Sequence, residues 1–402
     1  MSGAALPRAT IAGLSVTQII GWGSTYYIPS VLAAALRSSL GLSPELVFGG
    51  VSVMLLVSAA VAPRAGRIMQ ARGVRGPMIL GSAVMAAGLI ALSQAQGLWT
   101  YALAWLVIGL AAPIALTQAA MSALAQIAGA DARRAMGTLL LFSGFSSAVF
   151  WPLTAWLEAR LGWRETCLVF AGLHLLICCP LQALVIPTLT GRREARVAPG
   201  PQERLASRLP PGRERLAMAL VALAFSLGGF VSWGLPLQLV AILTAFGHPA
   251  ATAVSIGALM GPAQVAARIG EVTLGQRADV LRIGLVATAL MPFVVALPLI
   301  ESQAVWVAIA FVVGYGLSAG TMTVVRSVLP LVLFGPADYA RLLGRLALPQ
   351  NTAFALSPTA YAAVMSAAGP RGALVLSCLG AALALAAMIG LNVAVGRSPE
   401  TG

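Results

Sequence analysis

Two arginines stand inside long apolar stretches of this 402-residue chain. Arg268 lies in the run 250–274, three residues before Glu271 and on the same helical face. Arg326 lies in the run 303–333, about two helical turns from its end, too far to reach water comfortably. A guanidinium presents a planar fork of donors that matches a carboxylate. These arginines predict an anion site, against the competing interpretation that Arg268 pairs with Glu271 and Arg326 ties its helix to a neighbour.

A polar and aromatic stripe marks the first apolar run. Gln18, Trp22, Thr25 and Tyr26 recur at i, i+4, i+7 and i+8, so a helix would place them on one face. Lipid offers such a stripe no hydrogen-bond partners, which favours an interior cavity over an interfacial aromatic belt.

Three further side chains extend this prediction. Trp233 occupies the corresponding place in the second half, while Gln118 and Asn351 are amides that either line the cavity or join helices. The predicted substrate-binding set is Arg326, Arg268, Gln18, Trp22, Tyr26, Gln118, Trp233 and Asn351.

Catalytic and metal chemistry find little support in the sequence. His174 and the pair Cys178 and Cys179 suggest a metal or metalloid site, but a lone membrane histidine bonded to a neighbour and two small apolar thiols explain them better. Neither a zinc spacing nor a disulfide framework is readable, and no Walker loop or Ser/His/Asp constellation occurs. We therefore expect no metal, no cofactor and no enzyme activity.

The elements that position these residues are membrane helices. The chain is 59% hydrophobic and 9% charged with a mean hydropathy of +0.90, whereas soluble domains carry about 25% charged residues. A bilayer core needs ~20 apolar residues per helix. Twelve such runs predict an all-α membrane protein: 10–36, 44–66, 76–95, 99–127, 136–158, 165–187, 217–245, 250–274, 282–299, 303–333, 346–367 and 371–395.

The basic residues, all 25 of them arginine, predict the orientation. With both termini cytoplasmic, the outer loops hold Arg37, Arg160, Arg164 and Arg371, and nearly all others fall on the inner side. The net charge of +13 is thereby a topology signal, so nucleic-acid binding is not expected.

A polar, Pro- and Arg-rich segment divides the twelve runs into two sets of six. We predict an N-terminal bundle at 1–188, a cytoplasmic linker at 189–216 and a C-terminal bundle at 217–402. Weak internal repeats support duplication, since 63–67 matches 267–271 at an offset of 204 residues.

This organisation resembles the major facilitator superfamily of secondary transporters. The loop Gly66-Arg67-Ile68-Met69-Gln70-Ala71-Arg72-Gly73-Val74-Arg75 is similar to the family pattern Gly-x-Leu-x-Asp-Arg-x-Gly-x-Arg/Lys. Gly66, Gly73 and Arg75 match, while Gln70 replaces the acid. The resemblance implies a gating loop that latches the two halves, here through neutral hydrogen bonds and the partners of Arg72 or Arg75.

Further segments resemble a bacterial branch near the monocarboxylate and oxalate/formate transporters. They are Gly162-Trp163-Arg164, the stretch 326–330, Phe334-Gly335 and Tyr339. The resemblance implies a bacterial inner-membrane transporter that moves a small organic anion, a mono- or dicarboxylate, by alternating access. Gln264 stands where that branch carries an aspartate, so a coupling proton and a counter-substrate both stay open.

Two alternatives remain at this stage. A largely apolar cavity and the thiols of Cys178 and Cys179 favour efflux of neutral lipophilic compounds or of a metalloid such as arsenite. A passive channel or a non-transporting receptor on the same fold is the second. Glycines 109, 314, 316 and 320 are expected at close helix contacts.

Overall fold

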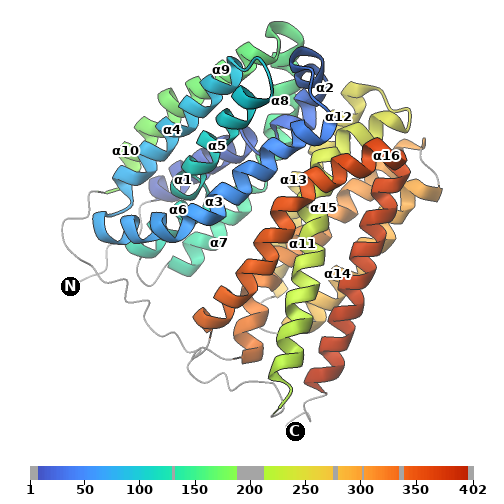
Figure 1. Ribbon diagram of the computed structural model, residues 1–402. Coiled ribbons are helices and arrows are strands. Elements are labelled where there is room, and N and C mark those ends of the chain that lie inside the picture. The colour runs from blue at the N-terminus through green and yellow to red at the C-terminus, as the bar shows by residue number, and fades with distance from the viewer. Residues whose placement is uncertain are drawn as a thin grey trace. The chain divides into compact units, whose positions relative to one another are not determined.

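The computed structural model describes the chain in six stretches: residues 8–128, 132–187, 212–274, 279–300, 303–334 and 339–396. The side chains of residues 133, 271–274 and 339–344 are not described. Within these limits the elements are helices, in two units, Met1–Ala198 and Pro199–Gly402 (Figure 1). Most of the predicted linker 189–216 lies outside the described residues.

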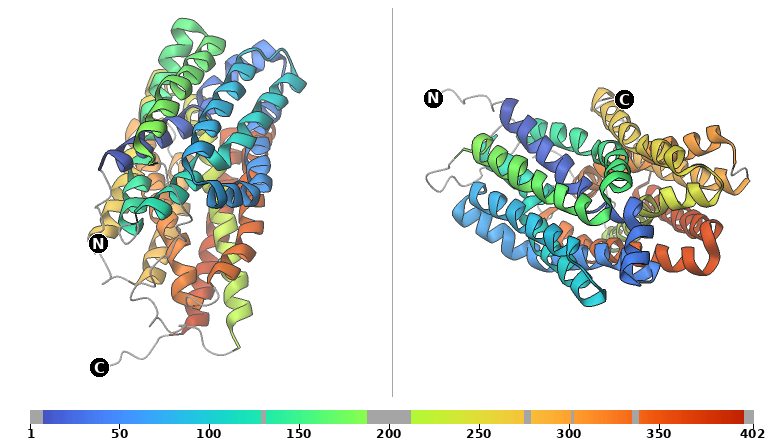
Figure 2. Two further views of the ribbon diagram at one scale, coloured as in Figure 1. Left: turned by 90° about the vertical axis from the view of Figure 1, so that its left-hand side faces the viewer. Right: turned by 90° about the horizontal axis from the view of Figure 1, so that it is seen from above.

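The first unit is built from short and long helices that pack side by side (Figures 1 and 2). Its elements are α1 (Arg8–Gly23), α2 (Ile28–Leu40), α3 (Pro44–Arg72), α4 (Arg75–Ser93), α5 (Leu98–Ala115), α6 (Thr117–Ile127), α7 (Ala132–Ser143), α8 (Ser146–Leu161), α9 (Trp163–Leu173), the π-helical segment η2 (His174–Cys178) and α10 (Cys179–Val185).

The second unit contains fewer and longer helices. They are α11 (Glu214–Ala245), α12 (Ala250–Ala258), α13 (Met260–Leu274), α14 (Val280–Ile300), α15 (Val305–Phe334) and α16 (Tyr339–Val395).

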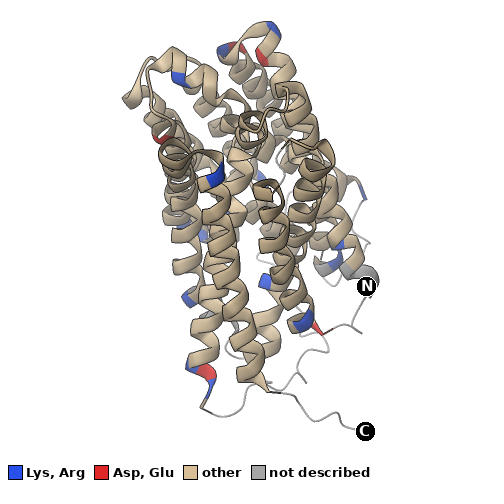
Figure 3. Ribbon diagram, turned by 90° about the vertical axis from the view of Figure 1, so that its right-hand side faces the viewer, with Lys and Arg blue, Asp and Glu red and all other residues tan. Residues whose placement is uncertain are grey.

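Eleven helical stretches among the described residues are long and apolar enough to cross a membrane. The last of them, Arg345–Val395, has 51 residues and contains the non-helical Gly369 (φ 66°, ψ −167°). A single crossing needs ~20 residues, so this stretch supplies two, and the predicted twelve-helix all-α fold is confirmed. Figure 3 shows long stretches of helix without a charged residue, as expected of a multi-pass membrane protein.

The first predicted span is interrupted rather than continuous. The helix α1 ends at Gly23, a turn follows at residues 24–27, and α2 begins at Ile28. Pro29 lacks the backbone N–H that would bond to the carbonyl of Thr25, and its ring disfavours a continuous helix there. The expectation that Thr25 and Tyr26 continue the helical stripe of Gln18 and Trp22 was therefore wrong in its geometry, because both lie in the turn.

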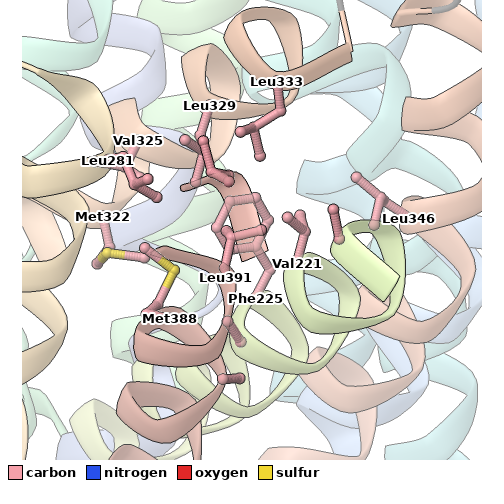
Figure 4. Packing of buried hydrophobic residues seen from close by; sticks show 14 of the residues in the cluster. Val221, Phe225, Leu281, Met322, Val325, Leu329, Leu333, Leu346, Met388 and Leu391 are labelled. Atoms are coloured by element: carbon pink, nitrogen blue, oxygen red, sulfur yellow. The ribbon is translucent and has the colours of Figure 1, made fainter. Parts of the chain in front are cut away.

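Each unit has an apolar core of its own. In the second unit, Phe225 of α11, Val325 and Leu329 of α15, and Met388 and Leu391 of α16 converge (Figure 4). In the first unit, buried side chains from α1, α3, α4, α6 and α7 form a similar cluster.

The predicted close helix contacts at glycines are confirmed. A Cβ on Gly109 would lie 3.0 Å from the carbonyl oxygen of Met54, and one on Gly320 would lie 2.6 Å from that of Gln264. Neighbouring backbones therefore approach closely at these two positions.

Candidate functional site

Arg326 of α15 lies half-buried inside the second unit. Its Nε atom is buried and has no hydrogen-bond partner among the described residues. The guanidinium carbon stands 5.5 Å from the centroid of the Phe354 ring. A cation over an aromatic face gains ~0.5–2 kcal/mol, but the ring accepts no hydrogen bond in the guanidinium plane. The donor fork of Arg326 is thus available to a further acceptor.

The ring of Phe354 also stacks on Trp233. Their centroids are 5.4 Å apart and their planes differ by 14°. Arg326, Phe354 and Trp233 therefore form one contiguous set, which we call the arginine–aromatic group. It combines a cationic donor with two flat apolar surfaces.

A glycine on α11 lets the arginine–aromatic group pack closely against this helix. A Cβ on Gly229 would lie 1.8 Å from Cε1 of Phe354, and one on Gly228 would lie 3.8 Å from the NH2 nitrogen of Arg326. The absence of a side chain at Gly229 lets the Phe354 ring approach the backbone of α11, whereas the Arg326 guanidinium lies at an ordinary contact distance from the Gly228 position.

Two hydrogen bonds hold the flanking helices to α11. The Tyr315 hydroxyl of α15 donates to the carbonyl of Ser232 at 3.1 Å, and the Ser357 hydroxyl of α16 donates to the carbonyl of Phe230 at 2.5 Å. Because both acceptors lie within a turn of Trp233, the three helices that carry the group are tied together at this level.

A second cluster of predicted residues lies in the first unit. Gln18 is fully buried, and its amide nitrogen donates to the carbonyl of Ala115 at 3.1 Å. The Thr117 hydroxyl lies 3.4 Å from the Gln18 amide oxygen and accepts from the Trp22 indole nitrogen at 2.8 Å. Leu116 has extended backbone angles between α5 and α6, so these bonds stabilise an interrupted helix.

Aromatic rings continue this cluster along the turn after α1. The Trp22 and Tyr26 centroids are 5.9 Å apart, those of Tyr26 and Tyr27 4.9 Å, and those of Tyr27 and Trp151 5.6 Å, all edge to face. Tyr26 is buried, whereas Trp22 is half-buried.

The remaining predicted residues lie elsewhere. Arg268 is buried in α13 with 8% exposure, and the side chain of its proposed partner Glu271 lies outside the described residues. Gln118 of α6 and Asn351 of α16 are exposed. Sequence patterns missed Phe354 and Thr117, because a phenylalanine in an apolar run and a threonine in a helix carry no distinctive spacing.

The predicted gating loop joins α3 to α4. The helix α3 ends at Arg72, Gly73 adopts φ 76° and ψ 170°, and α4 begins at Arg75. Gln70 and Arg72 are exposed, while a Cβ on Gly66 would meet nothing within 4 Å. The Gln126 amide donates to the carbonyl of Met69 at 3.2 Å and ties the end of α3 to α6.

The cysteines are free thiols. Cys178 is buried in η2, and the Cys179 thiol lies 3.5 Å from the carbonyl oxygen of Ile79. Across the described part of the chain, no three His, Cys, Asp or Glu side chains gather in a way that could hold a metal ion.

Comparisons with known proteins add a family and a fold. The family model described as Major Facilitator Superfamily matches residues 14–271. The human organic anion transporter MFSD10 (TETRAN) has a similar structure, with a TM-score of 0.65, 16% identity, and coverage of 96% of this chain and 99% of that chain. A mutant of the nucleoside transporter NupG has a TM-score of 0.74, 12% identity and the same coverage, 96% and 99%. No curated protein matches the sequence.

Proposed function

This chain belongs to the major facilitator superfamily, and from that premise we propose that it is a secondary active transporter for a small organic anion, a mono- or dicarboxylate. In this proposal the transporter works by alternating access in a bacterial inner membrane, with both termini cytoplasmic. The distribution of the arginines along the sequence supports the orientation.

The proposal depends on the position of Arg326 within a membrane span. A charged side chain within a membrane span costs ~2.5–3.5 kcal/mol on insertion scales, so its retention calls for a partner. The buried Nε atom of Arg326 has none among the described residues, and the aromatic face beside it leaves the in-plane donors open. A substrate carboxylate would accept from this fork in a bidentate arrangement.

The carbon skeleton of the substrate would lie along Phe354 and Trp233. These rings supply apolar surface next to the cation, so carboxylates with a planar or apolar skeleton fit better than strongly hydrated ones. In the first unit we propose that half-buried Trp22 and buried Tyr26 contact substrate, while Gln18 holds the wall in place.

Three weaker candidates complete the proposed set. They are Arg268, Gln118 and Asn351, whose side chains carry hydrogen-bond donors that suit an anion. Ligand binding by the three single alanine variants shows which of these residues belong to the site. The exposed loop residues Gln70 and Arg72, with Arg75, are proposed to control opening on the cytoplasmic side.

Thermal unfolding of the detergent-purified protein against organic anions, cations, neutral drugs and arsenite tests the proposal. Ligand binding to the folded state raises the melting temperature by mass action. We expect carboxylates to raise it in the wild type and to lose that effect in Arg326→Gln. The matched control is Arg345→Gln, which removes an exposed arginine from α16 and should keep the effect.

The opposite result would favour efflux. A shift caused by lipophilic compounds or arsenite alone, retained in Arg326→Gln and lost in Cys178→Ser or Cys179→Ser, would overturn the anion proposal. Conductance without saturable flux in proteoliposomes would indicate a channel instead.

A further inference from the structure

A buried histidine in the first unit joins two irregular segments of backbone. His174 is 1% exposed, and its Nε2 atom lies 2.9 Å from the hydroxyl oxygen of Ser24, which is fully buried. His174 opens the π-helical segment η2, and Ser24 is the first residue of the turn between α1 and α2. One hydrogen bond thus connects the two places where these spans depart from regular helix.

The hydrogen bonds of Ser24 determine which histidine nitrogen carries the proton. The Ser24 hydroxyl donates to the carbonyl of Ile20 at 2.7 Å. A hydroxyl has one proton, and with that proton directed at the carbonyl of Ile20 the bond to His174 runs from Nε2–H to the serine oxygen. Nδ1 of His174 then carries a lone pair, and this buried atom has no hydrogen-bond partner in the part of the chain that the structure describes.

On the described helices that pack against η2, no charged residue stands at the level of His174. The helices α1, α4, α9 and α10 pack against η2. Their charged residues stand at helix ends: Arg8, Arg75, Arg164 and Glu165. The other titratable groups on these elements and in the adjoining turn are thiols and phenols: Cys167, Cys178, Cys179, Tyr26 and Tyr27. Even Glu165 is about 14 Å from His174 along a helix axis.

This packing accommodates a neutral imidazole only. A second proton on Nδ1 would create a buried cation whose new N–H has no acceptor, and burying an uncompensated charge is costly. Protonation therefore requires a conformation in which water or a backbone carbonyl reaches Nδ1. The irregular backbone on both sides suits such a change, since the amides of Thr25 and Tyr27 donate to the carbonyl of Trp22 at long distances of 3.5 and 3.4 Å.

We propose that His174 and Ser24 form a proton-binding site whose occupancy is coupled to opening of the α1–α2 turn, so that transport by this chain is proton-coupled. A proton from water on one side adds to the Nδ1 lone pair in the open conformation. It must leave to water before the packing seen here re-forms, so binding and release alternate with the conformations. The proposal rests on alternating access, and it is independent of the charge of the substrate.

Histidine NMR of the full-length protein in liposomes tests the site without any substrate. The chain has two histidines, so ¹⁵N-histidine labelling gives a simple spectrum, and His248→Gln assigns it. We expect His174 to carry its single proton on Nε2 at pH 8 and to gain a second proton as the pH falls to 5. A ring that keeps one proton throughout this range would overturn the proposal. Because this measurement leaves His174 and Ser24 unchanged, it tests the proposal even if a His174 variant does not fold.

Amide hydrogen exchange tests the coupling. Peptides that contain residues 20–30 are compared at pH 5.5 and 7.5 in the wild type, His174→Gln and His248→Gln. Comparison at equal pH removes the intrinsic pH dependence of exchange. We expect severalfold faster exchange in the wild type and His248→Gln than in His174→Gln at pH 5.5, and equal rates at pH 7.5. Equal exchange in all three proteins at both pH values would make His174 a structural residue.

Failure of the anion proposal would look different. Arg326→Gln retaining every ligand-induced stabilisation would remove the substrate assignment and leave both of these measurements unchanged.

Discussion

Gly229 of α11 and Phe354 of α16 share a space that one methyl group would fill, since a Cβ on Gly229 would lie 1.8 Å from Cε1 of Phe354. This close approach places the ring in contact with both Trp233 and Arg326. The position of the proposed anion-binding arginine therefore depends on a residue without a side chain on another helix.

The first prediction concerns this glycine. Gly229→Ala should displace the Phe354 ring, lower the free energy of unfolding by ~1–3 kcal/mol through overpacking, and weaken carboxylate binding. Gly228→Ala is the matched control, because its Cβ would meet Arg326 and Ala384 only at 3.8 and 4.0 Å. Thermal unfolding with and without carboxylate measures both effects. Equal stability and equal carboxylate binding in the two variants would contradict the close contact between Gly229 and Phe354.

The second prediction separates the aromatic surface from general core packing. Phe354→Leu and Trp233→Leu should each weaken carboxylate binding by ~0.5–2 kcal/mol, because they remove ring faces beside the guanidinium. Phe311→Leu removes a fully buried ring of α15 and should lower stability without a change in affinity. Isothermal titration at matched folded fractions makes the comparison. If Phe311→Leu lowered the affinity for carboxylate as much as Phe354→Leu does, the assignment of Phe354 to the binding site would be wrong.

The third prediction concerns the interrupted helix in the first unit. Trp22→Phe and Thr117→Val each remove one end of a 2.8 Å hydrogen bond, so their effects on unfolding should be coupled rather than additive. Interhelical bonds in membranes average ~0.6 kcal/mol, which is the coupling expected from a double-mutant cycle. Additive effects would show that the bond contributes nothing.

The fourth prediction distinguishes a buried from an exposed amide. Gln18→Leu leaves the carbonyl of Ala115 without its donor and should cost ~1–3 kcal/mol of stability. Gln118→Leu, at an exposed position, should leave stability unchanged. If Gln118→Leu nevertheless weakens carboxylate binding, Gln118 belongs to the site as the sequence predicts. Denaturant unfolding and ligand titration of both variants give the two readouts.

The fifth prediction separates the two glycines of the gating loop. Gly73 has φ 76° and ψ 170°, backbone angles that residues other than glycine rarely adopt. Gly73→Ala should therefore destabilise the loop by ~1–3 kcal/mol. Gly66 lies inside α3 with nothing within 4 Å of its Cβ position, and Gly66→Ala should be neutral or slightly stabilising. Unfolding in detergent measures both changes. A larger loss of stability in Gly66→Ala than in Gly73→Ala would contradict this prediction.

The position of Arg326 inside a span could be predicted from hydropathy, because the cost of a charge in lipid makes such a residue conspicuous. Its neighbour Phe354 could not, because a ring in an apolar run gives no signal until the partner helix is known. Gln18 and Trp22 were predicted to share a face, and they meet at Thr117. Their predicted continuation to Tyr26 along the helix failed, because α1 ends at Gly23 and Pro29 lacks the N–H that a continuous helix would bond to the carbonyl of Thr25.

The sequence by itself determined the membrane-spanning helices, because the length and polarity of each run must match the bilayer. It also indicated the family through the glycines and arginines of the loop 66–75. Tertiary structure decided which side chains meet. The stack of Trp233 on Phe354, the bond between His174 and Ser24 and the approach of Phe354 to Gly229 all join residues that are far apart in the chain. Such contacts depend on how helices pack, and helical periodicity describes one helix at a time.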